Sequence, residues 1–172
     1  MKAGQKIKLR ALEPSDVDLL YEWENDQRIW HISNTIAPLS RFVLEQYVLN
    51  SHLDIFNTRQ LRFMIDDSFS GQTIGTADLF DFEPMHRRVG IGIFILESER
   101  NKGKASEALN LLIDYCFNTL MVNQVFCNIT PDNSESIQLF TKKGFELIGT
   151  RKNWLLINNH WTDENMYQLI KS

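Results

Sequence analysis

The apolar positions of the chain repeat with two different periods, so the sequence predicts both strands and helices. Alternating apolar and polar residues over 7–12 are typical of a strand with one buried face. Residues 105–117 instead carry apolar side chains at the three- and four-residue spacing of an amphipathic helix. The same criteria predict further strands at 61–65, 73–80, 89–96, 125–129, 145–150 and 165–170, and further helices beginning near residues 14, 40 and 134.

The order of these elements predicts a mixed α/β (α+β) fold. Residues 66–71 supply hairpin-turn chemistry between two strands, which argues against a purely parallel sheet. We therefore expect a mostly antiparallel sheet of about six or seven strands, flanked by about four helices. No repeat, low-complexity tract or interior linker interrupts the sequence, so we expect one domain over residues 1–172.

Composition limits the class of partner. With 43% hydrophobic residues the chain can form a substantial core, and a net charge of −4 argues against nucleic acid as the main partner. Residues 1–6 lack the apolar run of a signal peptide, and no apolar run approaches the length of a membrane span. We expect a cytoplasmic protein without a membrane partner. The exposed strand edges of a small, hairpin-rich domain favour a homodimer.

A short basic segment, Arg100-Asn101-Lys102-Gly103-Lys104-Ala105, joins a predicted strand to a predicted helix. The first N–H groups of a helix have no partner within it, and the helix dipole favours negative charge there. The three cations add positive charge, and Gly103 lets the backbone approach a ligand closely. The segment predicts binding of a phosphate-bearing cofactor. A nucleoside triphosphate is disfavoured because the glycine-x4-glycine-lysine-serine/threonine pattern is missing.

Two motifs give the chain a family resemblance. Arg100-x-x-Gly103-x-Ala105 follows a strand, and Asn133-x-x-Ser136-Ile137-x-Leu139-Phe140-x-x-x-Gly144-Phe145 begins about thirty residues later. In this order and on these elements they resemble the pyrophosphate loop and the second motif of the GNAT acyl-CoA-dependent N-acetyltransferases. The branch with ribosomal-protein N-terminal and spermidine/spermine N-acetyltransferases looks most similar.

The resemblance implies acetyl-CoA as cosubstrate and no metal. In the family, loop N–H groups bind the pyrophosphate, and the free backbone groups of a bulged, splayed central strand pair with the pantetheine arm. Carried onto this chain, the cofactor-binding residues are Phe94, Ile95, Leu96, Arg100, Asn101, Lys102, Gly103, Lys104, Ala105, Asn133 and Ser136. Asn133 is also a natural N-cap for the helix that follows it.

Two catalytic residues of the family pattern are missing from this chain. The related polyamine enzymes use a glutamate on the central strand as base and a tyrosine in the second motif as acid, and these positions hold Gly90 and Phe140. The catalytic residues are therefore unassigned. Asp81 and Glu83 near the end of the preceding strand, and His86 after it, are the candidates for the base.

The function expected from these features is transfer of an acetyl group to a primary amine. The acceptor is left open between a polyamine or other small amine and a protein N-terminus. Cys116 and Cys127 fall on predicted core positions, so direct attack by the amine is favoured over an acyl-enzyme. The alternative is an acyl-CoA-binding sensor or interaction module with weakened catalysis, which Gly90 and Phe140 favour.

Overall fold

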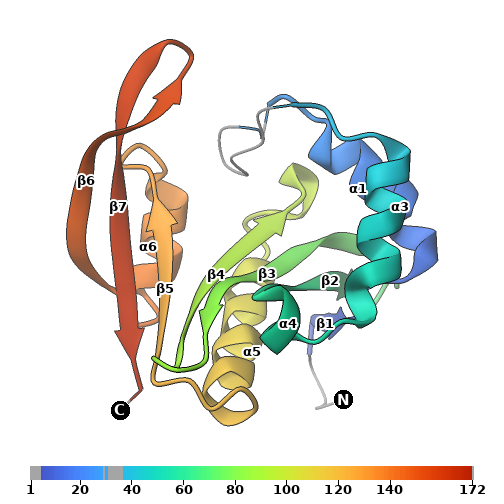
Figure 1. The fold of residues 1–172 in the computed structure, drawn as a ribbon, viewed down its shortest axis with the longest axis horizontal. Helices are drawn as coiled ribbons and strands as arrows, with labels where there is room; N and C mark the ends of the chain where they lie inside the picture. The colour runs from blue at the N-terminus through green and yellow to red at the C-terminus, as the bar shows by residue number, and fades with distance from the viewer. Residues whose placement is uncertain (1–4, 29, 31–36, 172) are drawn as a thin grey trace.

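The seven described strands form one sheet in the order β1-β2-β3-β4-β5-β7-β6 (Figure 1). The computed structural model describes residues 5–28, 30 and 37–171. The strands are β1 (Ile7–Arg10), β2 (Leu61–Asp67), β3 (Thr73–Glu83), β4 (Arg88–Ile95), β5 (Gln124–Ile129), β6 (Glu146–Ile157) and β7 (His160–Ile170). The described α-helices are α1 (Val17–Glu24), α3 (Arg41–Leu49), α4 (Ile55–Thr58), α5 (Lys104–Asn118) and α6 (Ser134–Thr141).

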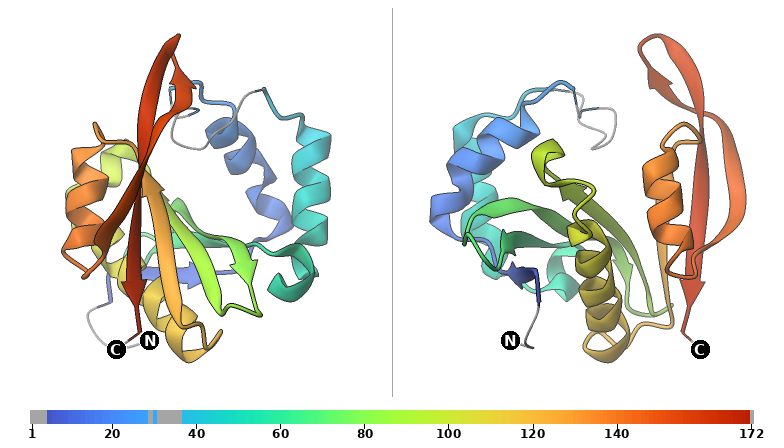
Figure 2. Two further views of the ribbon diagram at one scale, coloured as in Figure 1. Left: turned by 60° about the vertical axis from the view of Figure 1, so that its left-hand side comes forward. Right: turned by 180° about the vertical axis from the view of Figure 1, so that it is seen from behind.

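Helices cover both faces of the sheet, and each face has its own core. Neighbouring residues of β2 show this directly, because Met64 packs with α1 and α3 whereas Ile65 packs in the cluster that contains the buried face of α5. Successive side chains of a strand point to opposite faces, so α5 lies across the sheet from α1 and α3. Figure 2 shows the two layers from the side and from behind.

The sheet opens in its middle, between β4 and β5. This is the one parallel pair among the described strands, and its pairing runs only from Arg88↔Gln124 to Gly90↔Phe126. Beyond Gly90 the two strands diverge, while β4 stays paired with β3 as far as Ile95 and β5 stays paired with β7 (Figure 1). The opening therefore exposes one edge of β4 without disrupting the rest of the sheet.

The mixed α/β fold and the mostly antiparallel sheet are confirmed. The helix predicted to begin near residue 40 forms with Ser40 as its N-cap, and Asn133 caps α6 as expected. Each of the two side chains accepts a hydrogen bond from a backbone N–H group in the first turn of its helix. Two details differ: α4 was not predicted, and β6 and β7 extend well beyond 145–150 and 165–170. Most of β6 is exposed on both faces, so its sequence lacks the alternation that marks a half-buried strand.

In the part of the chain that the structure covers, no helix combines the length and the hydrophobicity needed to cross a membrane.

Candidate functional site

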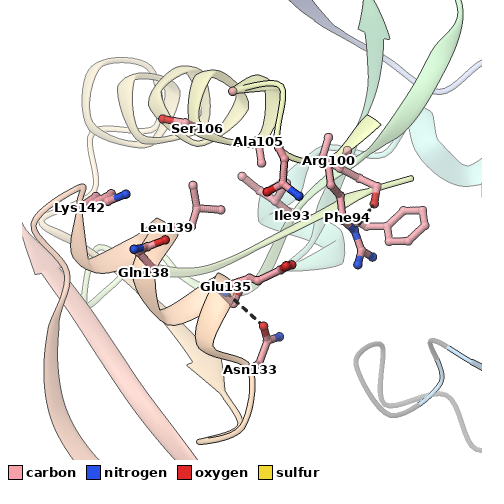
Figure 3. A pocket seen from close by; sticks show the side chains of 14 residues that line it. Ile93, Phe94, Arg100, Ala105, Ser106, Asn133, Glu135, Gln138, Leu139 and Lys142 are labelled. Atoms are coloured by element: carbon pink, nitrogen blue, oxygen red, sulfur yellow. Dashed lines mark hydrogen bonds between the residues drawn. The ribbon is translucent and has the colours of Figure 1, made fainter. Parts of the chain in front are cut away.

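A cavity of about 380 Å³ lies between the end of β4 and the helices α5 and α6. Figure 3 shows Phe94 and Arg100 at one end of it, with side chains of α5 and α6 along its walls. Its lining is Ile93, Phe94, Ile95, Arg100, Asn101, Gly103, Ala105, Ser106, Asn133, Glu135, Ser136, Gln138, Leu139 and Lys142. We call it the loop cavity. It brings together eight of the eleven residues that the resemblance implied for cofactor binding.

The loop at its edge has the backbone geometry that its glycine suggested. Gly103 is the N-cap of α5 with φ of 80°, in the left-handed region that glycine adopts at little cost, and Asn101 has φ of 59°. No side chain caps the helix, so its first N–H groups are left for a ligand. The Arg100 Nε donates a hydrogen bond of 3.2 Å to the Ile95 carbonyl and ties the loop to the end of β4.

Two lysines of the loop have other partners. The Lys104 ammonium lies between the carboxylates of Asp67 and Glu99, and Lys102 also pairs with Glu99. The hydrogen bond from Lys104, together with the N–H groups of Ser70 and Phe69, holds the pKa of the Asp67 carboxyl far below its ordinary value. Neither lysine lines the loop cavity. Lys104 instead anchors the loop to the β2–β3 turn, and Lys102 pairs with Glu99.

Leu96 does not offer the free backbone group expected of it, because its N–H donates to the Ile74 carbonyl at 2.9 Å. Backbone groups of a strand point alternately to its two edges, and the β3–β4 register is regular here. The groups of Phe94 therefore also face β3, whereas those of Ile93 and Ile95 face the opening. Leu96 lies outside the cavity lining as well.

Sequence reasoning missed the wall that α6 contributes. Glu135, Gln138, Leu139 and Lys142 line the cavity at the i, i+3, i+4, i+7 spacing of one helical face. The sequence pattern could have indicated this wall, because the four residues lie on the helical face next to the one that buries Phe140.

A second cavity, of about 660 Å³, lies where β4 and β5 diverge. We call it the cleft. Its lining comes from α3, β2 to β7 and α6 with the turn before it, and includes Tyr47, Arg62, Asp78, Gly92, Asn128, Asp132, Phe140, Leu155 and Glu164. It shares Ile93, Phe94, Asn133 and Ser136 with the loop cavity, so the two spaces meet at these residues.

An ion-pair cluster forms one end of the cleft. Arg62 donates to the carboxylates of Asp78 and Glu24, and its guanidinium lies 5.7 Å from the centre of the Tyr47 ring. Burial opposes the charge of Arg62, but Asp78 and its other neighbours raise the pKa of the guanidinium above its ordinary value. Two carboxylates facing one cation leave this end of the cleft with an excess of negative charge.

The two departures from the family pattern are both packed apolar positions. Phe140 is buried and its ring makes an edge-to-face contact with Phe145, with centroids 5.0 Å apart. At Gly90 a Cβ would lie 2.3 Å from Cε2 of Phe80, so the Phe80 ring occupies the space that a side chain at position 90 would need. Neither position supplies a titratable group.

Gly90→Ala tests this packing. Because the ring of Phe80 is packed edge-to-face against Phe126, it cannot retreat freely, and we expect the free energy of unfolding to fall by about 1–3 kcal/mol in urea titrations. Gly92→Ala is the matched control, since a Cβ there has its nearest contact at 3.9 Å and should leave stability unchanged. Equal stability of both variants would contradict the packing argument.

The candidates for the base lie elsewhere. Asp81, Glu83 and His86 sit at the β3–β4 hairpin, and none of them lines the loop cavity or the cleft. The hairpin is at the end of β4 opposite to Ile95, and the intervening strand spans roughly 20 Å at 3.3 Å per residue. The structure brings Asp78, rather than these three residues, to the cleft.

Comparisons with known proteins agree with this arrangement. The family model described as "Acetyltransferase (GNAT) domain" matches residues 6–146. A spermidine N(1)-acetyltransferase of Escherichia coli (strain K12) is 26% identical over 164 residues, which cover 94% of this chain and 84% of that protein. An uncharacterized N-acetyltransferase, p20, of Bacillus licheniformis is 27% identical over 168 residues, covering 97% and 94%.

Solved structures share the fold. A spermidine N-acetyltransferase from Vibrio cholerae, in complex with CoA and spermine, superimposes with a TM-score of 0.87 at 24% identity and covers 96% of this chain and 95% of its own. A probable acetyltransferase gives a TM-score of 0.86 at 24% identity, covering 99% and 96%. With the family model spanning most of the chain, the protein belongs to the GNAT acetyltransferase family and is an acyltransferase that depends on acetyl-CoA.

Proposed function

We propose that the protein transfers the acetyl group of acetyl-CoA to the primary amine of a small molecule, within a single domain of residues 1–172. The observation that carries this proposal is the meeting of the two cavities at Ile93, Phe94, Asn133 and Ser136. A cofactor in the loop cavity would present its thioester at this junction, and an acceptor in the cleft would approach the thioester from the other side.

Acetyl-CoA fits the loop cavity by charge and by shape. Its pyrophosphate would bind the first N–H groups of α5 around Gly103 to Ala105, with Arg100 and Lys142 as nearby cations. Its pantetheine arm carries amides, and the edge of β4 that faces the opening has the backbone groups of Ile93 and the N–H of Ile95 to pair with them. Asn133 and Ser136 would lie against the arm from α6.

A small cationic amine fits the cleft better than a protein N-terminus. The Arg62 cluster has more negative than positive charge, and Asp132 and Glu164 add two further carboxylates to the lining. Relatives of known name at 26% identity act on spermidine, which is a cation of this kind.

Direct attack by the amine fits the two cysteines. Both are buried, and burial raises the pKa of Cys116 to about 12 and that of Cys127 higher still. A thiol that stays protonated at neutral pH is a poor nucleophile, so a covalent acyl-enzyme is disfavoured.

The test is release of CoA thiol from acetyl-CoA over a panel of polyamines, amino acids, monoamines and peptides with free N-termini. We expect turnover with di- and polyamines and little with peptides. Tight CoA binding without turnover on any amine would instead support a binding module, and preferential turnover of peptides would reject the small-amine acceptor.

A further inference from the structure

The proposed transfer needs a group that accepts a proton from the amine, and Gly90 and Phe140 provide none. The carboxylates that line the cleft are Asp78, Asp132 and Glu164. Asp78 accepts from Nε and Nη2 of Arg62 and from the Thr76 hydroxyl, so both of its oxygens are already occupied by donors. Asp132 is exposed in the turn before α6. Asp78 and Asp132 are therefore weaker candidates than Glu164 for accepting the proton.

Glu164 is a buried carboxylate with one oxygen that no described residue binds. It lies on β7, its residue is only 6% exposed, and its Oε2 accepts a hydrogen bond of 2.6 Å from Nη1 of Arg151 on the paired strand β6. Its Oε1 accepts no hydrogen bond from any residue that the structure describes. The ion pair holds one oxygen and thereby fixes the side chain. The other oxygen is left for a ligand.

The side chain that bears this oxygen lines the cleft, where an acceptor amine would bind. Phe140 and Leu155 line the same cleft, which makes its surroundings partly apolar.

We propose that Glu164 is the catalytic residue that deprotonates the acceptor amine, a role that rests on the proposed function. The ammonium donates one proton to Glu164 Oε1, and the lone pair released on nitrogen attacks the carbonyl carbon of the thioester. The C–N bond forms, the C–S bond then breaks, and its electron pair leaves on the CoA sulfur. The second amine proton ends on that sulfur, and Glu164 returns its proton to solvent.

Glu164→Gln tests the role, because glutamine keeps the size of the side chain and an oxygen for Arg151 but cannot accept the proton. With the best amine of the panel we expect kcat/KM for the amine to fall about 100-fold at pH 7, and CoA affinity to be unchanged. Only about one in 2,500 amines with a pKa near 10.4 is neutral at pH 7, and below that pKa the fraction rises about tenfold per pH unit. The deficit should therefore shrink to less than about tenfold near pH 9.5.

Asp163→Asn is the matched control. It makes the same carboxylate-to-amide change one residue away, where the carboxylate pairs with the exposed Lys152, and it should leave kcat/KM unchanged. A Glu164→Gln deficit that is equal at all pH values, or that comes with weaker CoA binding, would overturn the catalytic role in favour of a structural one. Absence of turnover by the wild-type protein would overturn the proposed function, whereas turnover that Glu164→Gln leaves intact would overturn the role of Glu164 alone.

Discussion

Gly103→Asp is expected to weaken acetyl-CoA binding by about 100-fold or more. A carboxylate at the N-cap of α5 would face the pyrophosphate at the place where unpaired N–H groups now lie. Two like charges about 4 Å apart near a protein surface repel by up to about 4 kcal/mol, and a loss of about 3 kcal/mol corresponds to the expected change in Kd. Isothermal titration of CoA into each variant measures it directly.

Gly103→Asn separates charge from backbone strain. Asparagine has nearly the shape of aspartate and tolerates the left-handed backbone that position 103 adopts at φ of 80°. A Cβ there meets only the far end of the flexible Lys6 side chain, at 3.4 Å. We expect both variants to fold and the asparagine variant to lose less than about tenfold in affinity. Equal affinities in the two variants would place the pyrophosphate elsewhere.

Arg10→Met is expected to cost about 3 kcal/mol of stability at pH 7. Arg10 on β1 forms two hydrogen bonds with Asp16, of 2.7 and 2.8 Å, and a third with Asp66. The Asp16 side chain is 3% exposed, so removal of the guanidinium leaves a buried carboxylate without a counter-charge. Urea unfolding of the variant and the wild type gives the difference.

The pH dependence of this loss has a definite sign. Burial opposes ionisation of Asp16, but hydrogen bonds from Arg10 and from the Glu13 N–H outweigh it and leave the pKa of Asp16 below its ordinary value. The stability gained from the pair is therefore present above the unfolded pKa near 3.9 and is lost as the pH falls through the folded pKa. The difference between wild type and variant should narrow below about pH 4.

Arg28→Met provides the matched control for this experiment. Arg28 also pairs with an aspartate, Asp26, but its side chain is 83% exposed. An exposed pair gains little over hydration by water, so no measurable change in stability is expected. A comparable loss in both variants would show that removal of any arginine, rather than the buried network, causes the effect.

The sequence predicted the elements whose pattern is local. The stripe of α5, the helix start near residue 40, the cap at Asn133 and the glycine turn at 103 each depend on a few neighbouring residues, and all of them form. The full lengths of β6 and β7 were not predictable in this way, because their exposed residues are held by pairing with each other rather than by a buried face.

The candidate site also has one part that depends on neighbouring residues and another that depends on residues far apart in the sequence. Phosphate-loop chemistry was visible in six consecutive residues, whereas the cleft combines residues from strands that are far apart in sequence. Asp81, Glu83 and His86 were predicted as candidates for the base because they surround the end of a strand. The pairing of Phe80 with Gly90 places that strand end at the β3–β4 hairpin, away from the two cavities. Glu164 lies in a stretch with no recognisable motif, and only its burial beside Arg151 and the cleft distinguishes it.

The short pairing between β4 and β5 has a consequence for cohesion. Strand contacts join the two halves of the sheet over three residue pairs at one end only. A pantetheine arm lying along the free edge of β4 would supply backbone-like hydrogen bonds beyond Gly90, where none of the described strands pairs with this edge. The bound cosubstrate would then connect the two halves of the sheet where the strands do not. Because it binds only the folded protein, acetyl-CoA should raise the free energy of unfolding.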